Sequence, residues 1–189
     1  MNFTYIPYER PELEVLDEFY DNICELFFVT QSYFLLNKSQ QILDTSKKNL
    51  VIDRSIYEDI NIFARYWMSN YPIRKVDKNA YLQLTKLILS VVPKSDIEIF
   101  CACSTPQLLD RFDSRPRRSF EKKYPSNYIK NLNEIYNDDC YFKRCFRLDM
   151  DKYDIRHKDM QFLLIEDINL IAKGYYSKLR ILEYQEDDD

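Results

Sequence analysis

The stretch Asn49–Ser55, NLVIDRS, decides the fold. Its apolar run Leu50–Ile52 has the length and composition of a buried strand, and Asp53-Arg54 follows that run directly. Ser55 and Glu58 have the spacing of a capping box, which predicts that a helix begins at the carboxyl end of the strand. An acid and a guanidinium at this place suit an anion or a hydroxyl awaiting deprotonation. The alternative is a salt bridge that only ties the strand to the helix.

Short apolar runs alternate with longer stretches of helical periodicity along the rest of the chain. Further strands are predicted at 3–6, 96–101 and 145–148. Helices are predicted at 13–21, 25–43, 56–67, 77–92, 128–136 and 160–172, and another begins at Thr105-Pro106. This alternation predicts an α/β fold of three layers, with a parallel sheet between helices. Ligands of such sheets bind beyond the carboxyl ends of the strands, so Asp53-Arg54 and the loop after Cys103 are the expected sites.

The composition is that of a globular protein. Of the 189 residues, 46% are hydrophobic and 31% are charged, and we expect a single domain over residues 1–183 with an acidic tail at 184–189. The net charge of −4 argues against a nucleic-acid partner. We find no apolar stretch of the about 20 residues that span a bilayer, and no signal-peptide pattern. We therefore expect a cytoplasmic protein without a membrane partner, with a mitochondrial or virus-encoded origin left open.

Two residue types narrow the chemistry. Gly174 is the only glycine, so this sequence cannot build a glycine-rich loop around a phosphate. The five cysteines include no Cys-x-x-Cys pair and His157 is the only histidine, so we expect no metal site made by a cluster of protein ligands. The cysteines follow no secreted framework and are expected to be reduced thiols.

Several polar residues stand in unusual contexts. Gln31 interrupts an apolar and aromatic helix, where a buried amide would pair with a nucleobase edge; the alternative is a position that faces water. Tyr20 and Phe63 could line such a pocket or belong to the core. An eight-residue segment holds four arginines that could close over a polyphosphate, or lie in a solvated loop. They are Arg111, Arg115, Arg117 and Arg118.

Five segments, taken in chain order, resemble the deoxyribonucleoside kinase family, which includes thymidine, deoxycytidine, deoxyguanosine and deoxyadenosine kinases. Asp53-Arg54-Ser55-Ile56-Tyr57, which matches the family's Glu/Asp-Arg-Ser motif, is the most specific. The other four are LDEFY at 16–20, TQSY at 30–33, the arginines from 111 to 117, and YIKNLN at 128–133. The resemblance implies a P-loop-kinase-like fold and transfer of the ATP γ-phosphoryl group, with Mg²⁺, to the 5′-hydroxyl of a deoxynucleoside in nucleotide salvage.

The resemblance also implies a role for each candidate residue. Glu9 would be the catalytic base, Arg54 would steady the 5′-oxygen and the phosphoryl group, and Asp53 would lie near Mg²⁺. Tyr20 would contact the sugar 3′-hydroxyl, Gln31 would pair with the base and Phe63 would stack on it. The lid, at about 111–124, would cover the ATP phosphates with its four arginines. Glu121 is the candidate sugar carboxylate, one residue later than an ungapped match places it. A homodimer through 25–43 and 56–67 is expected.

The sequence also departs from the family pattern. The family begins with a strand and Gly-x-x-x-x-Gly-Lys-Ser/Thr, whereas this sequence starts near the family's second strand and reads Glu9-Arg10-Pro11 where Glu-Pro is usual. Without the first strand we expect a shortened sheet in which two strands have moved together, an N-terminal segment that fills the gap, or an incomplete chain. The function is then either a deoxyribonucleoside kinase in N-terminally truncated form, or a non-catalytic member that binds a nucleoside or a protein partner, with ATP binding in doubt.

Overall fold

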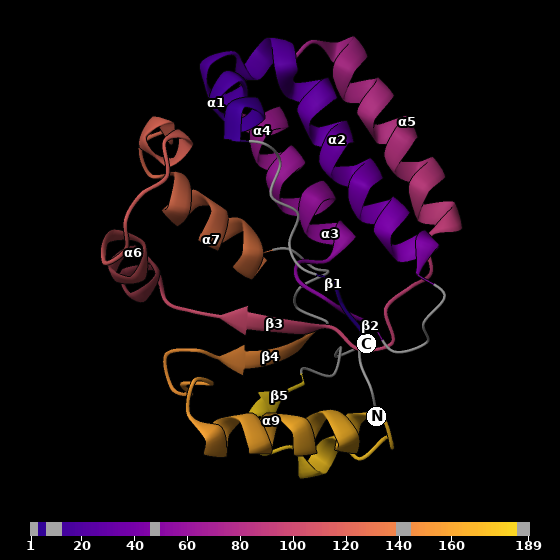
Figure 1. Cartoon of the computed structure of the whole chain (residues 1–189), viewed down its shortest axis with the longest axis vertical. Helices are drawn as coiled ribbons and strands as arrows, with labels where there is room; N and C mark the ends of the chain where they lie inside the picture. Colours follow the sequence, from indigo (N-terminus) through magenta and orange to yellow (C-terminus); the bar gives the residue numbers. More distant parts are fainter. Residues whose placement is uncertain (1–3, 7–12, 46–49, 139–144, 185–189) are drawn as a thin grey trace. The chain divides into compact units, whose positions relative to one another are not determined.

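The computed structural model describes residues 4–6, 13–45, 50–138 and 145–184. The chain divides into two compact units (Figure 1): unit 1 is Met1–Lys94 with Arg117–Tyr128, and unit 2 is Ser95–Pro116 with Ile129–Asp189. Apart from Tyr184, the predicted acidic tail lies outside the described residues. In the described segments, no helix combines the length and the hydropathy needed to cross a bilayer.

Unit 1 is mainly helical and contains one parallel strand pair. Strands β1 (Thr4–Ile6) and β2 (Leu50–Ile52) pair in register, with Thr4 opposite Leu50. The helices are α1 (Leu13–Asp21), α2 (Ile23–Asp44), α3 (Ile56–Glu58), the π-helix η1 (Asp59–Ala64), α4 (Arg65–Asn70), α5 (Lys75–Val91) and the 3₁₀-helix η2 (Phe120–Lys123). Helix α2 lies between α5 and the α3–α4 segment and contacts α5, α1 and η1 (Figure 1). The predicted helices at 13–21, 25–43 and 77–92 are thereby confirmed within two residues.

The buried face of α2 is largely polar. The apolar repeat at Leu26, Val29, Tyr33 and Leu36 correctly predicts a helix, but Val29 is 64% exposed. The buried face instead carries Thr30, Gln31, Ser32, Lys38 and Ser39 beside Phe27 and Leu35. Since burying polar groups is costly unless they are hydrogen-bonded, this inward polar face marks α2 as more than a packing element.

The helix predicted at 56–67 is present, but its start and its register differ from expectation. Ser55 is the N-cap, yet its hydroxyl makes no cap hydrogen bond and is buried without a partner among the described residues. The serine half of the expected capping box is therefore wrong, and a carboxylate oxygen of Glu58 lies 4.0 Å from the Arg54 Nε. The π turn η1 adds a residue to one turn, so Ile62 is fully buried while Phe63 is only half-buried.

Unit 2 is a three-layer arrangement, as predicted. Its sheet has the order β3 (Ile99–Ala102), β4 (Phe146–Asp149), β5 (Leu182–Glu183). The helices are α6 (Thr105–Asp113), α7 (Tyr128–Asp138), which starts at the last residue of unit 1, α9 (Lys158–Ile171) and the 3₁₀-helix η3 (Tyr176–Lys178). One face of the sheet packs on α9 through a cluster that includes Leu148 and Ile171. The other face meets α7, where Phe100 stacks on Tyr136 at 5.6 Å (Figure 1).

The strand pairing corrects one expectation. Strands β3 and β4 are parallel, but β5 is antiparallel to β4, so the sheet is mixed and not wholly parallel. The described strands form two separate ladders, β1–β2 and β3–β4–β5. The expected shortened sheet, with the strands at 50–52 and 96–101 moved together, stays a prediction, because these two strands lie in different units.

Candidate functional site

Arg54 occupies a strained turn between β2 and α3. Its φ of 65° lies in the left-handed region, which costs a residue with a Cβ about 1–2 kcal/mol. Its guanidinium carbon lies 5.1 Å from the centre of the Phe63 ring, and its Nε lies 4.0 Å from a carboxylate oxygen of Glu58. Strain of this kind persists where the surroundings fix it, which is typical of functional sites.

Asp53 precedes Arg54 and presents its carboxylate at the surface. Its Oδ2 accepts a hydrogen bond from the Tyr5 hydroxyl at 3.3 Å, and desolvation together with Asp53 raises the pKa of Tyr5. The Asp53 carbonyl oxygen accepts a 2.9 Å hydrogen bond from the Nζ of Lys38, a side chain only 2% exposed. The strand tip is therefore held from both sides, by β1 and by α2.

A cluster of aromatic residues surrounds Tyr20. Its ring stacks on Phe120 at 6.1 Å and lies 5.1 Å from Tyr124 and 5.7 Å from Trp67. Burial, then the neighbouring hydroxyls of Tyr128 and Tyr124, raise the pKa of Tyr20 far above its usual value. Burial likewise raises the pKa of Tyr128, while the charge of Arg54 lowers it. The structure thus brings Tyr20, Arg54 and Phe63 into one connected site in unit 1.

Gln31 and Lys38 lie on the same buried face of α2. They are seven residues, or about two turns, apart and are 4% and 2% exposed. Asp59, in η1, is 6% exposed, and its carbonyl oxygen is 3.5 Å from the Tyr81 hydroxyl. We did not predict Lys38 or Asp59 as site residues. The sequence could have indicated Lys38, because its spacing of seven residues from Gln31 places both on one face of a helix.

Glu121 is 5% exposed in η2, and its Oε2 accepts a 2.8 Å hydrogen bond from the backbone N–H of Arg118. The adjacent Phe120 stacks on Tyr20, so the element that carries Glu121 is packed on the element that carries the predicted sugar contact. The remaining catalytic candidate, Glu9, lies outside the described residues.

The lid arginines fall in both units. In unit 2, Arg111 donates to Gln107 Oε1 at 2.7 Å and to the Met150 carbonyl at 2.9 Å, and Arg115 lies 5.1 Å over Phe112. In unit 1, Arg117 is exposed and Arg118 lies 5.9 Å from the Phe120 ring centre. Most of these guanidinium groups are at the surface, where an anionic ligand can reach them.

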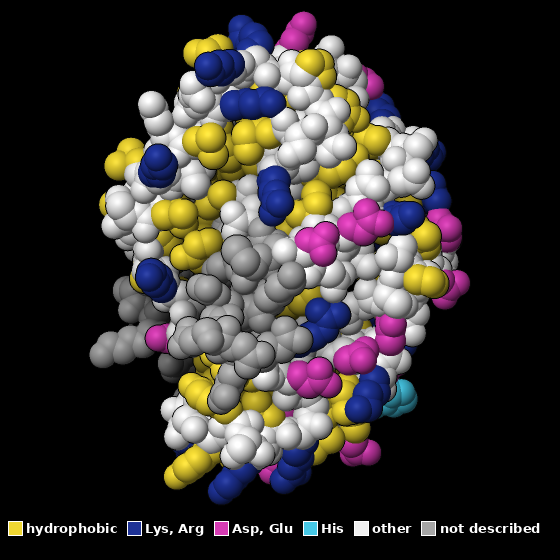
Figure 2. All heavy atoms as spheres, turned by 180° about the vertical axis from the view of Figure 1, so that it is seen from behind, with side chains coloured by type: hydrophobic (Ala, Val, Ile, Leu, Met, Phe, Trp, Pro, Cys, Tyr) yellow, Lys and Arg dark blue, Asp and Glu magenta, His cyan; other side chains and the backbone are white. Residues whose placement is uncertain are grey.

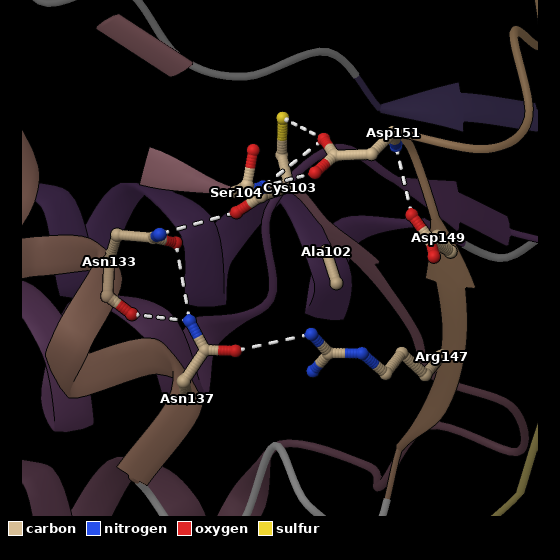
Figure 3. A pocket seen from close by; sticks show the side chains of 8 residues that line it. All are labelled: Ala102, Cys103, Ser104, Asn133, Asn137, Arg147, Asp149 and Asp151. Carbon is tan, nitrogen blue, oxygen red and sulfur yellow. Dashed lines mark hydrogen bonds between the residues drawn. The ribbon is translucent and has the colours of Figure 1, made fainter. Parts of the chain in front are cut away.

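The loop after Cys103 lines a polar cavity of about 220 Å³ in unit 2 (Figure 3). Arg147 donates to Asn137, and Asn133 donates to the Cys103 carbonyl. The Asp151 carboxylate accepts from the Ser104 N–H at 3.0 and 3.1 Å and from the Cys103 thiol at 3.1 Å. Burial, and then Asp151, raise the pKa of Cys103 to about 11. The cavity lies at the carboxyl ends of parallel strands, as expected, but none of the predicted site residues lines it.

The fold is kinase-like. The structure of deoxyadenosine kinase from M. mycoides with bound dATP aligns with a TM-score of 0.66 and 23% identity, over 87% of this chain and 86% of that one. The structure of that kinase with bound dCTP aligns with a TM-score of 0.67 and 24% identity over the same shares. The sequence comparison identifies the family within this fold: the deoxynucleoside kinase model matches residues 2–170, and the chain belongs to the deoxynucleoside kinase family.

Two curated relatives come from Bacillus subtilis (strain 168). Deoxyguanosine kinase is 35% identical over 127 residues, which are 64% of this chain and 58% of that protein. Deoxyadenosine/deoxycytidine kinase is 29% identical over 147 residues, which are 74% of this chain and 67% of that protein. The chain thus spans less than two thirds of the length of the deoxyguanosine kinase that it matches.

Proposed function

We propose that this chain binds a deoxynucleoside and takes part in transfer of the ATP γ-phosphoryl group to its 5′-hydroxyl. The observation that carries the proposal is the placement of Arg54 at the tip of β2, in a left-handed turn over Phe63 and near the Tyr20–Tyr128 pair, of which Tyr128 is buried. A fixed guanidinium at this place stabilises charge that develops on the 5′-oxygen and on the transferred group.

The chemistry divides among the proposed residues. Glu9 takes the proton of the 5′-hydroxyl, that oxygen forms a bond to the γ-phosphorus, and the bond from this phosphorus to the ADP oxygen breaks. Gln31 is assigned to the base because its buried amide suits a nucleobase edge. Tyr20 and Glu121 are assigned to the sugar, and Tyr20 stacks on Phe120, the residue next to Glu121. The lid arginines, exposed in large part, are assigned to the phosphates of ATP.

Magnesium and the ATP phosphates need further groups. Among the described residues no three His, Cys, Asp or Glu side chains lie close enough to form a metal cluster. The exposed Asp53 carboxylate fits Mg²⁺ as a single protein ligand, the usual number when phosphates and water complete the shell. When bound, Mg²⁺ would neutralise phosphate charge. With one glycine, these 189 residues supply no glycine-rich loop, so the proposal assigns to them the nucleoside end and the lid arginines.

The function is tested by binding and transfer measured on the same purified chain. Calorimetry with the four natural deoxynucleosides measures binding, and radiolabelled ATP measures 5′-phosphorylation. Arg54→Ala should lose transfer while Arg74→Ala, which removes an exposed arginine paired with Asp77, should keep it. Transfer that survives Arg54→Ala, or a folded chain that binds no deoxynucleoside, would contradict the proposal.

A homodimer is the proposed assembly. Helix α2 exposes an uncharged apolar stripe, and apolar side chains reach the surface over the helical part of unit 1 (Figure 2). The stripe consists of Val29, Tyr33, Leu36 and Leu43. An exposed apolar face of this kind favours association. Light scattering should give a particle mass of twice the 23.0 kDa chain mass. The Leu36→Glu variant should give the mass of a single chain.

A further inference from the structure

Ser119 lies at the surface in a strongly basic stretch of the chain. It is exposed, as are five basic residues within four positions of it: Arg115, Arg117, Arg118, Lys122 and Lys123. The only acidic residue in the same stretch is Glu121, which is 5% exposed. Along the chain, the Ser119 hydroxyl is therefore flanked by exposed positive charge on both sides.

The backbone before Ser119 is irregular. Residues 116–118 lie outside helices, strands and turns, and each of them is exposed. Ser119 is the N-cap of η2, which is one 3₁₀ turn of four residues. Enzymes that act on a folded polypeptide gain access at exposed irregular segments, and a single turn opens locally at less cost than a core element. The Ser119 hydroxyl is therefore accessible to a modifying enzyme.

The same hydroxyl fastens η2 to α1. It donates a hydrogen bond of 2.7 Å to Asp17 Oδ2. At the other end of η2, the Nζ of Lys123 lies 2.7 Å from Asp21 Oδ2 and 3.0 Å from the Asp17 carbonyl oxygen. We call these four side chains the η2 clasp: Asp17, Asp21, Ser119 and Lys123. The hydrogen bond from Ser119, and then Lys123, lower the pKa of Asp17, so the hydroxyl donates to a charged carboxylate at neutral pH.

A phosphate group on the Ser119 oxygen would reverse this interaction. It removes the proton that Ser119 donates and adds a charge of about −1.5 to −2 at pH 7. The clasp already has two carboxylates for the one ammonium of Lys123, so the phosphate would be a third anion, next to the Asp17 carboxylate. Like charges repel at this distance, so a modified Ser119 cannot return to its place on α1.

We propose that Ser119 is a phosphorylation site and that its modification releases η2 from α1. The enzyme is a serine/threonine protein kinase that selects basic residues on both sides of its acceptor, since charge patterns of this kind decide the choice of substrate. The Oγ of Ser119 forms a bond to the γ-phosphorus of ATP, the bond from this phosphorus to the ADP oxygen breaks, and the hydroxyl proton passes to a base of the kinase. In the released state, Arg117 and Arg118 are close enough along the chain to pair with the phosphate.

Release of η2 reaches the candidate site through the residue after Ser119. Phe120 is 4% exposed, and its ring stacks on that of Tyr20 with an interplanar angle of 5°. When η2 leaves α1, this contact opens, so deoxynucleoside binding should weaken. The expected loss of binding rests on the proposed function, whereas the modification site and the release of η2 do not.

The site is tested by phosphorylation of the full chain with radiolabelled ATP and a kinase of this selectivity. Peptide mass spectrometry should place the phosphate on Ser119, and Ser119→Ala should abolish its incorporation. Ser114→Ala removes another exposed serine of the same stretch and should leave the incorporation unchanged. A synthetic peptide of residues 113–124 is the control substrate. A kinase that modifies the peptide but not Ser119 of the folded chain overturns the proposal, and so does a kinase of this selectivity that modifies neither.

The release is tested by hydrogen exchange on the phosphorylated chain. The amides of η2 should exchange about tenfold faster or more than in the unmodified chain, while those of α9 in unit 2 keep their rates. Ser119→Ala removes the donor without adding charge and should give a smaller increase. Unchanged exchange in the phosphorylated η2 overturns the release. An unmodified, folded chain that binds no deoxynucleoside, but takes up phosphate and releases η2, instead overturns the proposed function alone.

Discussion

The Nζ of Lys38 donates a hydrogen bond of 2.9 Å to the carbonyl oxygen of Asp53, so a lysine from the middle of α2 fixes the residue directly before Arg54. Lys38 is only 2% exposed, and a buried ammonium is retained at a cost unless its partners compensate it. The relationship joins the buried polar face of α2 to the strained turn at the strand tip.

Lys38→Met keeps the length of the side chain and removes its charge and its donors. The Asp53 carbonyl then loses its buried partner, so we expect the free energy of unfolding to fall by about 1–3 kcal/mol and deoxynucleoside binding to weaken. Urea denaturation measures the first effect and calorimetry the second. Lys86→Met, at an exposed position of α5, is the control. Equal stability of the two variants would show that the Lys38 hydrogen bond contributes nothing.

The left-handed turn at Arg54 gives a prediction that is independent of any ligand. Arg54→Ala and Arg54→Gly both remove the guanidinium from the Phe63 ring, but only alanine keeps a Cβ at a φ of 65°. The glycine variant should therefore be the more stable of the two by about 1 kcal/mol. Thermal and urea unfolding of the pair measure the difference. An alanine variant at least as stable as the glycine variant would mean that the turn relaxes once the arginine is gone.

The C-terminal segment of unit 2 is anchored by one buried carboxylate. Asp167 is fully buried and accepts hydrogen bonds of 2.8–3.0 Å from the backbone N–H groups of Arg180, Ile181 and Leu182. Asp167→Asn replaces one acceptor by a donor that faces these N–H groups, so we expect a loss of about 2–3 kcal/mol in the free energy of unfolding.

Hydrogen exchange locates this effect. The amides of Ile181 and Leu182 should lose protection in Asp167→Asn while those of β3 keep theirs. Glu166→Gln removes the neighbouring carboxylate, which forms an exposed pair with the Arg180 guanidinium at 2.8 Å, and should cost less than about 1 kcal/mol. A similar loss in both variants would contradict the anchoring role.

The thiol of Cys103 should be unreactive at neutral pH. Burial and the Asp151 carboxylate raise its pKa to about 11, so the thiolate that attacks an alkylating reagent is scarce below that pH. The rate of modification by iodoacetamide at Cys103, followed by peptide mass spectrometry, should rise about tenfold per pH unit between pH 7 and 10. Asp151→Asn removes the negative charge and should shift the profile to lower pH. A Cys103 profile that levels off near pH 8.5 would contradict this environment.

Much of the fold could be predicted from local patterns. The run at 50–52 followed by an acid and an arginine specified strand, turn and helix, and the proline at 106 marked the start of α6, because these signals depend on neighbours in sequence. Strand β5 has two residues and forms only against β4, so no local pattern announces it. The serine cap expected before α3 does not form, since the Ser55 hydroxyl makes no hydrogen bond to the first turn of that helix.

The sequence predicted which residues belong to the candidate site better than it predicted their burial and contacts. The family resemblance suggested Tyr20, Gln31, Arg54 and Phe63, and the structure places Tyr20, Arg54 and Phe63 in one connected site. Periodicity indicated the helix but not its buried face, because a helix that buries polar groups carries its regular apolar stripe on the outside. The contacts of η2 with α1 join residues more than a hundred positions apart, and a single sequence does not reveal them.

The π turn at Asp59–Ala64 determines the direction in which the side chains of α4 point relative to those of α3. Each residue advances an α-helix by about 100°, so the extra residue of a π turn offsets everything that follows by that amount. Phe63, inside this turn, faces Arg54, and Trp67, which follows the turn, enters the aromatic cluster. Deletion of Ala64, the last residue of the turn, would leave a helix in which Phe63 and Trp67 no longer both point to their partners. The segment is thus a place where chain length, and not side-chain chemistry, tunes the site.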